Sequence, residues 1–218
     1  MNADIVVLVH GLWMHGLVMG LMQRRIARHG YAVRAHSYSS VRCDLRENAV
    51  RLAAFVQTLG SSRAHFVAHS LGGIVAMNAA ALMPREPLGR IVLVGTPFAE
   101  SFSGRRLERL PAGRSLLGAC MTQWLYEPRL LSSHTVRSLD VGVIAGTGGV
   151  GMGRFIAPGL PKPNDGVVAV EETRVPGMRD HIVLPVSHSA MLVSREVARQ
   201  ACAFLDNGRF ERSGIPAA

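Results

Sequence analysis

Short apolar runs alternate along the chain with segments in which apolar residues recur every three or four positions. The apolar runs predict buried strands at 4–10, 64–69, 90–95, 139–146 and 181–186, and alternation predicts a further strand at 31–38. Helical spacing predicts helices at 14–29, 44–59, 71–83 and 189–206. Nearly continuous apolar strands that alternate with helices predict an α/β fold, a mostly parallel central sheet flanked by helices on both faces.

The chain has 218 residues, which is enough for one domain with a sizeable core, so we expect a single domain over 1–218. Residues 97–137 lack a clear strand and include a helical-looking piece at 115–125. We expect 97–137 to form a short lid or a helical insertion, and no large cap domain is evident. The glycine- and proline-rich stretch 147–166 predicts a loop.

The net charge is +9, and Lys162 is the only lysine among the 24 Lys and Arg residues. The basic residues are scattered and are not interleaved with aromatic residues, so we expect no nucleic-acid partner. A basic surface attracts anionic groups, and peripheral contact with anionic lipid surfaces is a hypothesis. The sequence leaves the oligomeric state open.

The three cysteines, Cys43, Cys120 and Cys202, are far apart in the sequence and predict neither a zinc site nor a disulfide framework. Asp4 leads directly into an apolar run with no basic region before it, so no signal peptide is expected. No apolar run reaches the roughly 18 residues of a membrane helix. These features predict a cytoplasmic location.

Ser70 lies in VAHSLGG, residues 67–73, between a predicted strand and a predicted helix. A serine at this point can cap the helix by accepting a hydrogen bond from an N–H of its first turn. It can also be a nucleophile on a turn so tight that only small neighbours such as Gly72 and Gly73 fit.

A nucleophilic serine requires a base, and four histidines are candidates. His69 adjoins the serine and would leave the turn in the wrong direction, His10 is expected to brace loops, and His181 is expected to be exposed. His188 lies in the loop between the last strand and the last helix, where it can reach over the sheet edge, and it is the preferred base.

The base in turn requires a carboxylate to orient it. Asp165 in PNDGVV is preferred because it gives the chain order Ser, Asp, His, although a turn aspartate that bonds its own backbone is the alternative. Glu171, Glu172 and Asp140 are the other candidates, and both glutamates are expected to be solvated.

The oxyanion of such a reaction requires two N–H donors. The Leu71 N–H opens a predicted helix, where N–H groups are unpaired and the helix dipole is positive. The second donor is expected from Leu12 in the loop after the first strand, where His10 supports the loop and Gly11 lets the backbone approach the site. This chemistry requires neither a metal nor an organic cofactor.

Five ordered motifs, LVHGLW, VAHSLGG, VGTPF, DGVV and SHSAML, resemble the α/β-hydrolase superfamily from about residue 5 to residue 204. The likeness is to small bacterial serine esterases and lipases, although Ala68 replaces the first glycine of the G-x-S-x-G pattern. The resemblance implies that Ser70, Asp165 and His188 form a catalytic triad and that Leu12 and Leu71 form the oxyanion hole. The nucleophile is therefore preferred over the helix cap.

The resulting prediction is a serine carboxylic-ester hydrolase that acts through an acyl-enzyme on a small-molecule or lipid ester with an apolar acyl group. The pocket lining is expected to include Leu12, Trp13, Met14, Leu17, Val18, Met19, Phe98, Phe102, Trp124, Leu125, Met152 and Phe155, with core packing as their alternative role. The same triad would serve an acyltransferase, a thioesterase or an amidase. A non-catalytic binding module would require a broken triad, and the sequence shows no break.

Overall fold

The computed structural model describes residues 4–60, 62–127, 131, 133–149 and 158–212. Its centre is a six-stranded sheet in the order β2-β1-β3-β4-β5-β6, and every neighbouring pair is parallel. The strands are β1 (Ile5–Val9), β2 (Ala32–His36), β3 (Ala64–His69), β4 (Leu88–Val94), β5 (Val141–Gly146) and β6 (Asp180–Leu184). The predicted fold class is confirmed.

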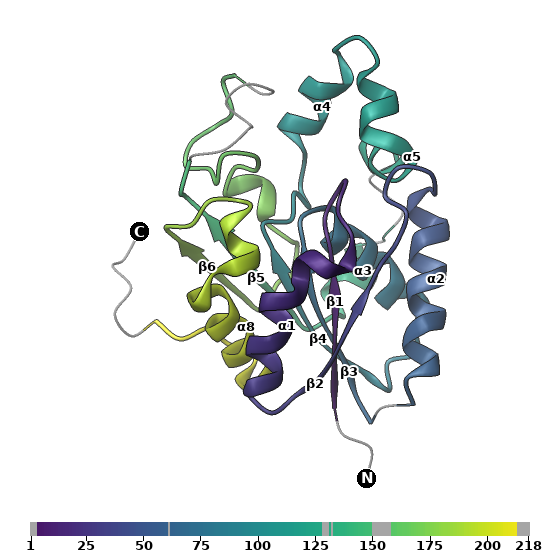
Figure 1. Cartoon of the computed structure of the whole chain (residues 1–218), viewed down its shortest axis with the longest axis vertical. Helices are drawn as coiled ribbons and strands as arrows, with labels where there is room; N and C mark the ends of the chain where they lie inside the picture. Colours follow the sequence, from purple (N-terminus) through teal and green to yellow (C-terminus); the bar gives the residue numbers. More distant parts are fainter. Residues whose placement is uncertain (1–3, 61, 128–130, 132, 150–157, 213–218) are drawn as a thin grey trace.

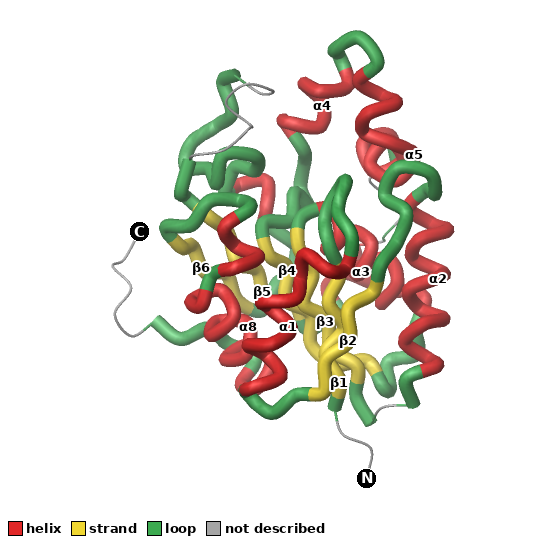
Figure 2. Tube along the Cα trace, viewed as in Figure 1, coloured by secondary structure: helices red, strands yellow, loops and turns green. Residues whose placement is uncertain are grey.

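Helices cover both faces of this sheet, as Figures 1 and 2 show. One face carries α1 (Gly20–Arg28) and α8 (Arg195–Asn207), and the other carries α2 (Leu45–Thr58) and α3 (Leu71–Leu82). Each face buries its own apolar cluster. The central strands are buried on both sides, which explains why their sequences are apolar throughout and do not alternate.

Two predicted helices are split in the structure. The predicted helix 14–29 begins as the 3₁₀ helix η1 (Gly16–Met19) before α1, and the closing helix begins as η4 (Ala190–Val193) before α8. Ser194 separates η4 from α8 because its side chain caps α8, accepting from the Val197 N–H at 3.2 Å. Asp44 caps α2 in the same way, because its side chain accepts from the Glu47 N–H at 2.7 Å.

The residues between β4 and β5 form α4 (Phe102–Glu108), α5 (Gly113–Tyr126) and α6 (Ser133–Arg137). In Figure 1, α4 and α5 stand beyond the carboxyl ends of the strands. This is the end of a parallel sheet where ligands bind.

The prediction that Leu17 and Val18 line a pocket is wrong. The Leu17 side chain is 84% exposed, and Val18 and Leu21 are exposed too, whereas Met22 and Ile26 are buried. The buried residues of this segment, Met19, Met22 and Ile26, recur at helical spacing across η1 and α1, so the exposed residues lie on the opposite side of the two helices.

Cys120 and Cys202 are buried, Cys43 is half-buried, and all three are free thiols. Within the described parts of the chain, none of the helices has both the length and the apolar character needed to cross a membrane.

Candidate active site

Ser70 stands on a sharp turn between β3 and α3, with φ 54° and ψ −129°. Its side chain makes no capping hydrogen bond, which excludes the helix-cap interpretation. A non-glycine residue in such a conformation is strained by about 1–3 kcal/mol and persists only where its surroundings fix it. Here the Ser70 N–H donates to the Val94 carbonyl at 2.9 Å, and the Thr96 hydroxyl donates to the Ser70 carbonyl at 3.0 Å.

Two glycines let the start of α3 press against the ends of neighbouring strands. A Cβ at Gly72 would lie 2.2 Å from the His10 carbonyl oxygen, and one at Gly73 would lie 2.0 Å from the Thr96 hydroxyl oxygen. Both distances are far below van der Waals contact. The small residues after Ser70 are therefore required by packing, as the tight-turn interpretation predicts.

Asp165 and His188 form a buried pair in the loops that follow β5 and β6. The His188 Nδ1 lies 2.7 Å from Asp165 Oδ2, and only a protonated Nδ1 can donate to that carboxylate. The other oxygen, Oδ1, accepts from the N–H groups of Val167 at 2.9 Å and Val168 at 2.7 Å. Asp165 is thus both the turn aspartate and the partner of the imidazole, so the two interpretations of this residue are compatible.

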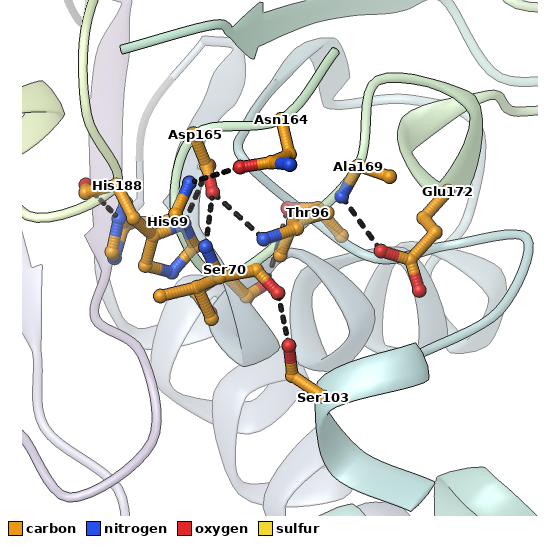
Figure 3. A network of polar contacts seen from close by, with 12 residues as sticks. His69, Ser70, Thr96, Ser103, Asn164, Asp165, Ala169, Glu172 and His188 are labelled. Carbon is orange, nitrogen blue, oxygen red and sulfur yellow. Dashed lines mark hydrogen bonds and ion pairs between the residues drawn. The ribbon is translucent and has the colours of Figure 1, made fainter. Parts of the chain in front are cut away.

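Ser70 and His188 both line one cavity of about 400 Å³. Figure 3 shows Ser70, His188 and Asp165 close together, in the loops that follow β3, β6 and β5. The bond to Asp165 leaves His188 Nε2 without a partner among the described residues, as a general base requires. No hydrogen bond joins this ring to the Ser70 hydroxyl in the described part of the chain, and such contacts often tighten only around a substrate.

Leu12 and Leu71, the expected oxyanion donors, line the same cavity. Neither of their N–H groups has an acceptor within the residues that the structure describes. Leu71 is the first residue of α3, so the positive end of the helix dipole lies at its N–H. Gly11 lies beside the serine, because a Cβ there would be 3.1 Å from Ser70 Cβ.

His10 supports the loop that carries Leu12. Its Nδ1 bonds the Gly11 carbonyl at 2.9 Å, its Nε2 accepts from the Tyr38 N–H at 3.2 Å, and its ring stacks on Tyr38. Both ring nitrogens are therefore engaged, and burial lowers the pKa of His10. These contacts suit a structural brace and not a general base.

His69 braces the loop that carries His188. Its Nε2 lies 3.0 Å from the His188 carbonyl oxygen, and the two imidazole centroids are 4.6 Å apart. Burial, and secondarily the His188 ring, lower the pKa of His69 to about 3, so this side chain is neutral near pH 7. The sequence excludes His69 as the base, because its side chain leaves the turn in the wrong direction, but gives no indication of this bracing role.

The expectation that Glu172 is solvated is wrong. Its carboxylate is buried and accepts from the N–H groups of Phe102 and Ala169, as Figure 3 shows in part, so it joins the start of α4 to the loop after Asp165. Burial raises its pKa. Glu171 is exposed and pairs with Arg174, as expected.

The remaining candidates lie away from the cavity. His181 was expected to be exposed but is half-buried, with Nε2 3.1 Å from the Thr173 hydroxyl. Asp140 pairs with Arg90 and Arg179 at the amino end of β5, opposite the site. Within the described residues, no group of three or more His, Cys, Asp or Glu side chains is arranged to hold a metal.

The cavity wall is mainly apolar, with a few hydroxyl groups. It includes Leu12, Trp13 and Met14 as expected, together with Leu71, Pro97, Ser101, Ser103, Gly104, Leu107, Leu117, Met121, Val167, Val168, Ser187 and Ser189. Phe98, Trp124 and Leu125 are core residues, which was their alternative role. Met152 and Phe155 lie outside the described residues.

The sequence pattern of the alpha/beta hydrolase family matches residues 6–211, so the chain belongs to this family. Among solved structures it resembles the mature lipase BlEst2 of Bacillus licheniformis, with a TM-score of 0.73, 18% identity, and coverage of 95% of this chain and 92% of that one. It also resembles the carboxylesterase CesB of Bacillus subtilis, with a TM-score of 0.56, 18% identity, and coverage of 94% and 84%. At these identities the likeness shows the fold.

A curated relative is similar over a shorter stretch. The dihydrolipoyllysine-residue acetyltransferase component of the acetoin cleaving system of Pseudomonas putida is 26% identical over 146 residues. The match covers 61% of this chain and 38% of that protein, so this chain corresponds to well under half of the length of the relative.

Several contacts that fix the site carry no signal in a single sequence. Ser40, a buried serine in the loop after β2, accepts from the Trp13 N–H at 3.1 Å, and Thr96 holds the carbonyl of Ser70. Ser40 is an isolated hydroxyl residue with no motif around it. Thr96 lies in VGTPF, one of the motifs that resemble the family, but the motif does not indicate which atom its hydroxyl contacts.

Proposed function

We propose that this chain is a serine hydrolase that cleaves carboxylic esters with an apolar acyl group through an acyl-enzyme on Ser70. The observation that carries the proposal is the meeting of a strained Ser70 with the buried Asp165–His188 pair in one mainly apolar cavity. A serine, an imidazole and a carboxylate with these relations are recognised by geometry and role.

In the first half of the reaction, Ser70 Oγ attacks the ester carbonyl carbon while His188 Nε2 takes the hydroxyl proton. The carbonyl electron pair moves onto oxygen, and the Leu12 and Leu71 N–H groups bind the resulting oxyanion. When the tetrahedral intermediate collapses, the bond to the alcohol oxygen breaks and His188 returns the proton to that oxygen. The acyl group remains on Ser70.

In the second half, water replaces the alcohol. His188 takes a proton from the water as its oxygen attacks the acyl carbon, and the carboxylic acid leaves as Ser70 recovers its proton. Asp165 holds His188 Nδ1 throughout and stabilises the imidazolium, while its second oxygen accepts from two backbone N–H groups. Each oxyanion donor of this kind contributes about 100- to 1000-fold in rate.

The size and the lining of the cavity support an apolar acyl group. A volume of about 400 Å³ suits a small organic group, and the wall is formed mostly by leucine, methionine, valine and tryptophan side chains. Small-molecule or lipid esters meet this description. The lipase and the carboxylesterase that share the fold agree with it by name.

The test is Ser70→Ala, assayed on a panel of nitrophenyl esters of increasing acyl length. We expect turnover to fall by about 10⁴- to 10⁶-fold while the circular dichroism spectrum is unchanged. Ser189→Ala is the matched control, because Ser189 lines the same cavity and has no assigned chemistry. A fluorophosphonate probe should label the wild type and Ser189→Ala but not Ser70→Ala; unchanged turnover in Ser70→Ala would end the proposal.

Acyl transfer is the second candidate, favoured by the similarity to an acetyltransferase component. The same acyl-enzyme would serve it, as it would serve a thioesterase or an amidase, and only the acceptor or the bond differs. Product analysis with ester and competing alcohols or thiols distinguishes them. Transfer that outruns hydrolysis at millimolar acceptor would favour the acyltransferase.

A further inference from the structure

The face of the molecule formed by η1, α1, η4 and the start of α8 carries exposed apolar side chains beside unpaired arginines. The apolar residues are Leu17, Val18, Leu21 and Val193, and their elements pack against one another. Single exposed apolar residues are ordinary, but four on adjoining elements need an explanation. We call this set, with the arginines described next, the α1–α8 face.

Arg24, Arg28 and Arg195 lie on this face, and all three are exposed. Together with Arg25 and Arg199 they line one open groove between α1 and α8. Figure 1 shows these two helices side by side on one face of the sheet.

Not all of this positive charge is available to a partner. Arg199 pairs with Glu196 and Glu211, and Arg25 donates to the Val193 carbonyl. Arg24, Arg28 and Arg195 have no acidic partner within the described residues. Around Arg24 and Arg28 the chain itself offers no partner, since residues 5–43 contain no Asp or Glu.

The α1–α8 face also adjoins the lining of the candidate active site. Met14 lines the cavity two residues before η1 begins, and Ser189 lines it one residue before η4 begins. Leu17 and Val193 therefore lie within four residues of the cavity lining along the chain.

We propose that the α1–α8 face docks on an anionic lipid surface. Exposed apolar side chains enter the boundary between headgroups and acyl chains, and arginines beside them meet the phosphate groups while their aliphatic stems lie along the apolar region. The charge complementarity selects an anionic lipid, and the apolar residues select a membrane over a purely polar acidic partner. Docking in this way would bring lipid esters close to the elements that line the cavity.

The test is co-sedimentation with vesicles, using Ser70→Ala protein so that binding is measured without hydrolysis. Vesicles of phosphatidylglycerol and phosphatidylcholine in equal parts are compared with vesicles of phosphatidylcholine alone. We expect binding to the anionic vesicles only, weakening as salt rises from about 0.1 M to about 0.5 M because screening shortens the reach of the arginines.

Two sets of variants in the same background locate the contact. Arg24→Gln, Arg28→Gln and Arg195→Gln together should lower the partition coefficient about a hundredfold, since each arginine near an anionic surface contributes about fivefold. Arg42→Gln, Arg46→Gln and Arg63→Gln remove the same charge elsewhere and should leave binding within a few-fold. Leu17→Asp should weaken binding about tenfold or more, and its control Val50→Asp, on α2, should not.

Equal binding to neutral and anionic vesicles would overturn the proposal, as would an equal loss in the control triple variant. Retention on heparin or polyglutamate with no vesicle binding would also overturn it, in favour of an acidic macromolecule. These outcomes are independent of the proposed chemistry, because hydrolysis of soluble esters by the protein with Ser70 intact is measured separately.

Discussion

The two sides of the cavity are held in different ways. We call the loops after β1, β3, β5 and β6 the floor, since they carry Ser70, Asp165 and His188, and we call α4 and α5 the roof. The floor is fixed by buried backbone contacts, including those of Ser70, Asp165 and Gly72 described above. Among the described residues, three polar contacts of side chains with backbone atoms join floor to roof: Trp13 Nε1 to the Leu116 carbonyl, Glu172 to the Phe102 N–H, and Ser103 Oγ to the Val167 carbonyl.

This difference separates two properties of the site. The floor must hold a strained serine and a hydrogen-bonded imidazole, so a displacement there changes the chemistry for every substrate. The roof supplies Leu107, Leu117 and Met121 to the cavity wall, so it shapes the space for the acyl group. Floor variants should therefore lower turnover on all esters alike, and roof variants should alter the preference among them.

The largest effect is expected for Asp165→Asn on the floor. The amide keeps the shape but no longer selects the Nδ1–H form of His188 or stabilises the imidazolium, so we expect kcat to fall about 10⁴-fold with KM little changed. Steady-state kinetics on short and long nitrophenyl esters measure this. Glu171→Gln, which neutralises an exposed carboxylate nearby, is the control and should retain full activity. A loss below tenfold in Asp165→Asn would remove Asp165 from the proposed triad.

Gly72→Ala should destabilise the floor, because the added methyl group has no room. A Cβ 2.2 Å from the His10 carbonyl oxygen forces backbone to move, and we expect a loss of about 3 kcal/mol or more in the free energy of unfolding. Gly20→Ala is the matched control, because nothing lies within 4 Å of a Cβ at that position. Urea unfolding of both variants measures the difference. Equal stabilities would mean that the close approach of α3 to β1 is not needed.

The floor was largely predictable from the sequence, because its requirements are local. Few backbone conformations fit a serine that is followed by Gly72 and Gly73, or an aspartate in the turn PNDGVV. The carboxyl ends of parallel strands then bring these residues to the same edge of the sheet. Even so, the buried place of Glu172 was missed. One of its backbone N–H partners, Ala169, lies three residues away in the chain, but the other, Phe102, lies 70 residues away at the start of α4, and no spacing in the sequence indicates that distant contact.

The roof could be predicted only as a helical segment. Periodicity indicated α5 but not which of its faces meets the cavity, so Trp124 was expected in the pocket and is a core residue. The pocket role expected of Leu17 is wrong for a related reason. Apolar residues lie on two sides of η1 and α1, and periodicity does not indicate that the side with Met19 and Met22 is the buried one. Tertiary contacts, absent from a single sequence, make that choice.

The dependence of stability on pH tests the floor through His69. The unfolded chain protonates this residue near pH 6.5, whereas burial lowers its native pKa to about 3. The contribution of His69 to the free energy of unfolding is therefore complete above about pH 6.5 and is lost as the pH falls toward 3. About 2 kcal/mol of it is lost at pH 5. Urea unfolding at pH 7.5, 6 and 5 measures the slope. His69→Gln should make the unfolding free energy less dependent on pH, by the equivalent of up to one bound proton. An unchanged slope would show that His69 is protonated in the native state.

The smallest effect is expected where roof and floor join, at Trp13. This residue has φ 59°, a strained conformation for a large side chain, and its indole N–H donates to the Leu116 carbonyl of α5 at 2.6 Å. Trp13→Phe removes that bond, and because a neutral, partly exposed hydrogen bond contributes about 1 kcal/mol, we expect about a fivefold change. The change should fall on kcat/KM for long acyl chains, while the acetate ester is turned over as before.

The control is Tyr126→Phe, which removes a hydroxyl from the last residue of α5. It should change kcat/KM for neither the long-chain esters nor the acetate ester. An equal fall on every ester in Trp13→Phe would mean instead that Trp13 acts on the oxyanion loop through its neighbour Leu12, and that roof and floor move as one unit.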